Sequence, residues 1–204
     1  MSLDLKPWHF YMIALTLFNL LIFATPFLVI HAEPIGNFLF TASSYTCHQL
    51  ASRSYCFYAA DGSIGDCPYL YTHAPILNSE KGPAYEFPVC ARDIAIYLGA
   101  LISGIAVYFT KWKDAKHTPH PIFFILALIP IGLDGGTQLL GWRESTNELR
   151  MLTGMIAGLA FSFYFVPMLN AILLKNTQKK EAAPAPPPKE EPEKISRKKH
   201  KNKK

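Results

Sequence analysis

The chain has 204 residues, about the length of one domain, and 50% of them are hydrophobic. Its formal net charge is +5, but the segment after Leu174 alone carries +7, so the remainder is slightly acidic. A basic charge confined to one tail argues against a nucleic-acid-binding fold, and the clustering of apolar residues in long runs argues against a soluble globular protein.

Four long apolar segments dominate the sequence: residues 7–30, 91–110, 119–141 and 150–174. A bilayer core about 30 Å thick needs roughly 20 such residues per helix, so each segment is predicted to span the membrane. The first segment is too long for a signal peptide, and Ile30-His31-Ala32 is a poor cleavage site. We therefore predict an all-α membrane protein in which residues 1–175 form a four-helix transmembrane domain.

The distribution of lysine predicts the orientation of these helices. Lys6, three lysines in the segment 111–118 and the lysine-rich tail all fall on one side of a four-helix topology. Because lysine and arginine collect in cytoplasmic loops, both termini are predicted to be cytoplasmic and residues 31–90 extracytoplasmic. The sequence thus indicates a multi-pass protein of the cell membrane.

Residues 31–90 form too long a connection to be a passive loop. The segment is rich in aromatic residues, and Asp61-Gly62 and Gly65-Asp66 indicate turns. We expect a small cap that lies on the extracytoplasmic end of the bundle.

All four cysteines lie in this cap, as expected for an oxidising compartment. Cys56 and Cys67 flank a short turn-rich segment without a neighbouring histidine, which predicts a local disulfide that closes a hairpin.

Cys47, His48, Cys90 and Asp93 have the number and types of ligands of a tetrahedral zinc site. A disulfide between Cys47 and Cys90 that fixes the cap to the second helix is the alternative, and redox-active thiols are a third.

Asp134 falls inside the third predicted helix, in the sequence Leu133-Asp134-Gly135-Gly136. A carboxylate within a membrane span usually faces the bundle interior and marks a functional site. We expect it to act in catalysis or to form an ion pair with Arg92 or Arg150.

Arginine is enriched on the predicted outer face, where the positive-inside rule does not expect it. The planar guanidinium binds carboxylate and phosphate through two hydrogen bonds, so converging arginines indicate an anionic ligand such as a lipid phosphate. Pairing with Asp93, Glu144 and Glu148 is the alternative. The candidate substrate-binding residues are Arg53, Arg92, Arg143, Arg150 and Gln138.

Two further patterns concern packing and the C-terminal tail. Gly132 with Gly136, and Gly154 with Gly158, form GxxxG patterns typical of closely packed membrane helices. Residues 176–204 are rich in proline and lysine, a composition typical of disorder, and would be attracted to anionic lipid of the cytoplasmic leaflet. Nucleic-acid contact is an alternative that we do not favour, and a solubilising role is another.

Several motifs occur in the order TCHQ, SRS, FPVCARD, IYLG, LDGGTQ and Arg150 followed by Thr153-Gly154. Through these motifs residues 45–158 resemble an uncharacterised family of predicted prokaryotic membrane proteins. The family commonly has Cys-Ala-Arg-Cys where this chain has Cys90-Ala91-Arg92-Asp93, and the family pattern resembles a zinc site. Asp93 can also ligate zinc. The resemblance implies no established activity.

Three functions fit these residues. The first is a membrane enzyme or binding protein for an anionic lipid-linked substrate, in which Asp134, His48 or a zinc-bound water would perform the chemistry. The second is a non-catalytic subunit or assembly factor of a larger membrane complex. The third is thiol-disulfide exchange by Cys47 and Cys90.

Overall fold

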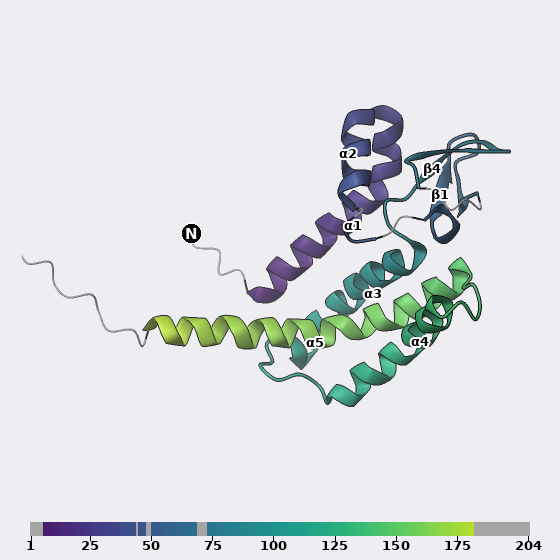
Figure 1. Ribbon diagram of the computed structural model, residues 1–204. Coiled ribbons are helices and arrows are strands. Elements are labelled where there is room, and N and C mark those ends of the chain that lie inside the picture. Colours follow the sequence, from purple (N-terminus) through teal and green to yellow (C-terminus); the bar gives the residue numbers. More distant parts are fainter. Residues whose placement is uncertain (1–5, 44, 48–49, 69–72, 182–204) are drawn as a thin grey trace, which may run out of the picture.

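The computed structural model describes residues 6–43, 45–47, 50–68 and 73–181, with side chains as far as Leu173. Within these ranges, four helices are long and apolar enough to cross a membrane. They are α1 (Pro7–His31), α3 (Ala91–Tyr108), α4 (Pro121–Leu139) and α5 (Asn147–Glu181), with the apolar part of α5 ending at Leu173. Figure 1 shows α5 lying along both α3 and α4, with α1 on the other side of α3.

The helix bounds differ from the predicted ones mainly at α4 and α5. Helix α4 begins at Pro121, which suits the first helical position because it has no N–H to leave unpaired, and the imidazole of His120 accepts the N–H of Ile122. Helix α5 begins three residues before the predicted position and continues to Glu181, so residues 176–181 of the predicted disordered tail are helical. The rest of that tail, residues 182–204, lies outside the described residues.

The cap contains a β-sheet, so the expectation of an all-α protein was wrong. After helix α2 (Glu33–Ser43) and the short 3₁₀ helix η1 (Ala51–Arg53), four antiparallel strands form a sheet in the order β2-β1-β4-β3. The strands are β1 (Tyr55–Tyr58), β2 (Ser63–Asp66), β3 (Ile76–Ser79) and β4 (Gly82–Glu86). Gly62 turns the chain between β1 and β2 with φ of +71°, a conformation that other residues rarely adopt. Each hairpin closes within a few residues, so the cap is compact.

An apolar cluster attaches the cap to the helices. Ile22 of α1, Phe87 and Val89 after β4, and Ile94 of α3 are buried against one another. Because these side chains come from both the cap and the helices, the segment that leads into α3 is held in place.

Helices α3 and α5 approach each other through glycine, as one of the two GxxxG patterns predicted. A Cβ atom at Gly158 would lie 2.3 Å from the carbonyl oxygen of Ile96, and one at Gly154 would lie 2.5 Å from that of Arg92. The prediction for Gly132 and Gly136 was wrong within this chain, because among the described atoms nothing lies within 4 Å of a Cβ at either position.

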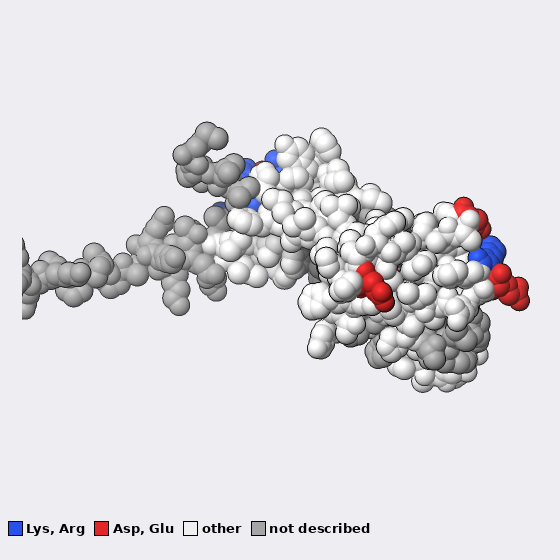
Figure 2. All heavy atoms as spheres, turned by 90° about the horizontal axis from the view of Figure 1, so that it is seen from above, with Lys and Arg blue, Asp and Glu red and all other residues white. Residues whose placement is uncertain are grey.

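The charged side chains of the described surface collect at two ends. Figure 2 shows lysine and arginine near the chain termini and mixed charges at the far tip of the cap, with a mostly uncharged surface between them. The lysine-rich end includes the 3₁₀ helix η2 (Lys111–Lys113) and the ion pair between Lys6 and Asp114. This distribution is typical of helices that cross a bilayer.

Candidate functional site

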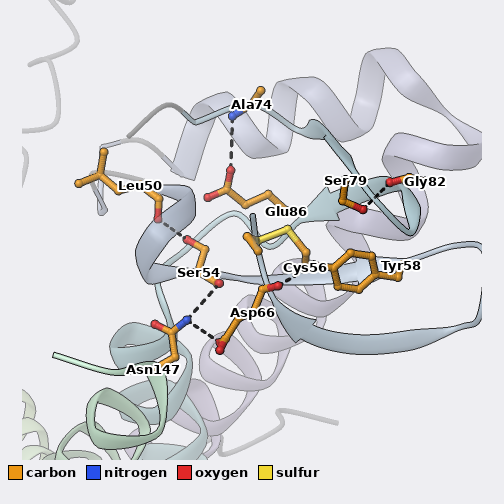
Figure 3. The surroundings of a disulfide bond; sticks show 11 residues. Leu50, Ser54, Cys56, Tyr58, Asp66, Ala74, Ser79, Gly82, Glu86 and Asn147 are labelled. Carbon is orange, nitrogen blue, oxygen red and sulfur yellow. Dashed lines mark hydrogen bonds between the residues drawn. A yellow bond between two sulfur atoms is a disulfide. The ribbon is translucent and has the colours of Figure 1, made fainter. Parts of the chain in front are cut away.

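The first turn of α5 is fixed to the cap beside a disulfide. Cys56 and Cys67 lie at disulfide distance, 1.97 Å between sulfurs. In Figure 3 the side-chain amide of Asn147 donates to the carbonyl oxygen of Ser54 at 3.3 Å and to the carboxylate of Asp66 at 2.8 Å. These hydrogen bonds hold the start of α5 against the cap.

Asp134 is held between two guanidinium groups. Its side chain is 2% exposed, with Arg92 Nη2 at 2.5 Å from one carboxylate oxygen and Arg143 Nη2 at 2.8 Å from the other. Arg143 also donates from Nε to the hydroxyl of Thr137 at 3.1 Å. Asp134 thus connects α4 to α3 and to the loop before α5. A carboxylate with both oxygens bound to cations is a weak base, so this geometry favours a positioning role over catalysis.

Arg150 is almost fully buried, with 3% exposure, and its partners are neutral. It donates to Asn147 Oδ1 at 2.7 Å and to the carbonyl oxygen of Ser52 at 3.4 Å. When the amide oxygen of Gln138 is turned toward the guanidinium groups, it accepts from Arg150 Nη2 at 2.9 Å and from Arg53 Nε at 3.3 Å. The structure therefore brings the predicted residues Arg53, Gln138 and Arg150 together.

Neither Arg53 nor Arg150 has a carboxylate within 4.0 Å among the described residues, where the arginine ion pairs are those of Arg92 and Arg143 with Asp134. The buried Nε atoms of Arg92 and Arg150 also have no hydrogen-bond partner in the described part of the chain. A buried cation without a counter-ion costs several kcal/mol. Among the described residues, no carboxylate offsets the charge of Arg150 at ion-pair distance.

Arg53, Arg92 and Arg150 line a cavity of about 240 Å³. This is roughly eight times the volume of a water molecule in the liquid. Among the described lining residues there are three arginines and one carboxylate, an excess of two formal positive charges. Arg143 does not line it, because this side chain contacts Asp134 and Thr137 instead. The lining residues are Thr46, Cys47, Leu50, Arg53, Cys90, Arg92, Asp93 and Arg150.

A second hollow of about 660 Å³ lies on the cap, and Glu80 and Lys81 are among the residues that line it. It is larger but open to solvent, and its charged side chains are not buried, so we assign the candidate site to the smaller cavity.

Two thiols and a carboxylate lie in the same cavity. The Cys90 thiol donates to Asp93 Oδ2 at 3.2 Å, the backbone N–H of Cys90 donates to Cys47 Sγ at 3.3 Å, and the three ligand atoms lie within 4.8 Å of one another. Cys47 and Cys90 are thiols in this structure. The predicted partner His48 lies outside the described residues.

The thiol of Cys90 is poorly suited to act as a nucleophile by itself. Its hydrogen bond with Cys47, its burial and the nearby carboxylate of Asp93 raise its pKa above the usual value for cysteine. A protonated thiol attacks a disulfide slowly.

Glu86 in β4 is a second buried acid near this cavity. Its side chain accepts the backbone N–H of Ala74 at 3.3 Å (Figure 3), and burial raises its pKa to about 8. Burial thus favours the neutral form of this carboxyl.

The sequence did not single out two of the residues that support Arg150. Asn147 lies three positions before Arg150, one helical turn away, and this spacing on a helix is the signal that could have indicated the contact. Ser52 contributes through its carbonyl oxygen, for which the sequence gives no signal.

Four helices long and apolar enough to cross a membrane, with buried polar groups at one end, define the class of a membrane protein. The chain belongs to the DUF2085 family of predicted membrane proteins, which matches residues 83–164. That match contains α3 to α5 except the end of α5, and hence Cys90, Arg92, Asp134 and Arg150.

Two archaeal relatives extend this assignment. An uncharacterised protein of Methanocaldococcus jannaschii is 33% identical over 177 residues, which are 83% of this chain and 97% of that protein. An uncharacterised protein of Methanothermobacter thermautotrophicus is 41% identical over 78 residues, which are 38% of this chain and 68% of that protein. No solved structure matches the chain.

Proposed function

We propose that this protein binds the phosphate group of an anionic lipid in the cavity lined by Arg53, Arg92 and Arg150. The observation that supports this most is Arg150, which is buried and, in the described part of the chain, donates to neutral groups only. A phosphate that accepts hydrogen bonds from two or three guanidinium groups would supply the missing negative charge.

The position of the cavity supports a lipid over a soluble anion. Arg92 lies in the first turn of α3 and Arg150 in the first turn of α5, so both lie at the end of an apolar helix. Leu139 and Trp142, at the same end of α4, are 89% and 76% exposed, and tryptophan is enriched where membranes meet water. In the proposal, the arginines lie at the depth of lipid headgroups.

The lysine distribution supports an extracytoplasmic location for this end of the bundle. Lys6, Lys111 and Lys113 are at the opposite end from the cap, which suits a cytoplasmic surface with both termini. In the proposal, the cap and the cavity face the outer leaflet of the cell membrane.

A second candidate function is a non-catalytic subunit of a larger membrane complex. It is favoured by the open space beside Gly132 and Gly136, which would admit a helix of a partner. If no anion binds, this candidate becomes the better one.

The test is calorimetric titration of the purified protein in a nonionic detergent. We expect dihexanoyl phosphatidic acid to bind and dihexanoyl phosphatidylcholine, which has the same chains and no net charge, not to bind. Equal affinity for inorganic phosphate would indicate a free anion as ligand, and no binding of either phosphate would overturn the proposal.

Arg53→Gln is the informative variant because Arg53 is exposed, so its loss should not unfold the protein. We expect the affinity for phosphatidic acid to fall about tenfold or more, since a charged hydrogen bond is worth about 1.5–3 kcal/mol. Lys81→Gln, which removes one positive charge from the outer surface of the cap, is the matched control and should change affinity less than about twofold.

A further inference from the structure

The cavity holds a second set of ligands besides the arginines. Sulfur atoms of Cys47 and Cys90 and a carboxylate oxygen of Asp93 lie within 4.8 Å of one another. They come from two segments, the chain before η1 and the start of α3, which the cap brings together. All three residues also line the cavity that contains Arg53 and Arg150.

From this geometry we infer that Cys47, Cys90 and Asp93 bind a divalent metal ion of the zinc class. Two sulfurs and one oxygen suit zinc, which takes thiolate and carboxylate ligands at about 2.0–2.3 Å and hence about 3.5 Å apart in a tetrahedron. The distance of 3.2 Å between Cys90 Sγ and Asp93 Oδ2 is close to this separation between two ligands. Sulfur ligands argue against magnesium and calcium, which prefer oxygen.

The positive charge of the arginines allows an anion to bind in the cavity together with the metal ion. A divalent ion that replaces the protons of two thiols leaves the formal charge of the cavity unchanged. The two excess positive charges from Arg53, Arg92 and Arg150 against Asp93 therefore remain available. The metal and the anion can occupy the cavity together.

The described residues supply three ligands, and a further group fills the fourth tetrahedral position. Here the inference rests on the proposed function: an oxygen of the phosphate held by the arginines becomes the fourth ligand. The metal would then polarise the phosphate of the lipid. Binding of the metal itself does not require the lipid.

The first measurement is the zinc content of the protein, purified without chelator and equilibrated with zinc, together with the visible spectrum of the cobalt-substituted form. We expect about one zinc per chain, and a thiolate-to-cobalt charge-transfer band that disappears in Cys47→Ser and Cys90→Ser. Zinc content far below this, or a cobalt band that persists in both serine variants, would overturn the inference.

Asp93 offers a pair of variants with opposite expected effects. Asp93→Ala should weaken zinc binding by about tenfold or more, whereas Asp93→Cys, which provides a third thiolate, should bind at least as tightly as the native chain. Asp61→Ala, at the exposed turn between β1 and β2, is the control and should leave zinc affinity unchanged. A disulfide between Cys47 and Cys90 in protein purified anaerobically would also contradict the inference.

Titration with dihexanoyl phosphatidic acid separates this inference from the proposed function. We expect zinc to tighten lipid binding about tenfold in the native chain and to have no effect in Cys90→Ser. Lipid binding by protein that holds no zinc after equilibration with zinc would leave the proposed function intact and refute the metal site. Zinc binding without lipid binding would support the metal site and overturn the proposed function.

Discussion

Replacing Asp134 with asparagine is expected to lower the free energy of unfolding by about 3 kcal/mol. Asparagine preserves the shape of the side chain but removes the charge that two guanidinium groups share. Arg92 is 21% exposed and would lose its counter-ion in a place where water replaces it poorly. Because Arg143 is 42% exposed and can be hydrated, we expect the lower end of the range for broken buried ion pairs.

Unfolding of detergent-solubilised protein by a denaturing detergent, followed by circular dichroism, would measure this change. Asp114→Asn is the matched control, because it breaks the ion pair between Lys6 and Asp114. The Lys6 side chain is 54% exposed and that of Asp114 is 62% exposed. Exposed pairs contribute about 0–1 kcal/mol, so the control should be nearly silent. Equal effects of the two substitutions would show that Asp134 does not connect the helices as described.

A methyl group at Gly158 is expected to be nearly as damaging. The added Cβ of Gly158→Ala would lie 2.3 Å from the backbone oxygen of Ile96, so α3 and α5 would have to separate. Backbone atoms cannot rotate away as side chains can, and overpacking of this kind costs about 1–3 kcal/mol or more. Because Arg92 and Arg150 lie on these two helices, the same change should weaken lipid binding.

Gly132→Ala provides the comparison, since the space beside Gly132 is open among the described atoms. Alanine favours a helix over glycine by about 1 kcal/mol, so this variant should be as stable as the native chain or slightly more stable. The same unfolding assay applies to both variants. If Gly132→Ala is the more damaging one, the helix packing described for α3 and α5 is incorrect.

The four long helices could be predicted from the sequence because their length and hydropathy follow directly from the bilayer. The sheet of the cap could not be predicted. Each strand has only four or five residues, too few for alternation of buried and exposed positions to stand out. Tyr58 of β1, one of the aromatic residues of this segment, is buried in the core of the cap.

Several residues that the structure brings together around the cavity could be named from the sequence, but which of them pair could not. The carboxylate in a membrane span indicated that Asp134 contacts arginine, and one predicted partner, Arg92, is found. The second partner is Arg143 instead of Arg150. Partner choice depends on how each helix is rotated and on where the loop after α4 returns, and neither is encoded in a local pattern.

The thiols illustrate the same limit. The sequence brought Cys47 and Cys90 together as a disulfide or as metal ligands, and the structure has them as adjacent thiols with Asp93. Spacing alone cannot distinguish these alternatives, because a pair of sulfurs near one another suits both. The neighbouring arginines, which come from η1, α3 and α5, give the cavity its positive charge and motivate the proposal of an anion.

The most direct test of the anion site is the anomalous diffraction of crystals of this protein equilibrated with tungstate, a heavy analogue of phosphate. We predict a tungsten peak in the cavity, within hydrogen-bond reach of the guanidinium groups of Arg53 and Arg150, and no such peak in crystals of Arg53→Gln at the same concentration. An empty cavity at a tungstate concentration that displaces phosphatidic acid, or a peak that remains in Arg53→Gln, would contradict the anion site proposed for this membrane protein.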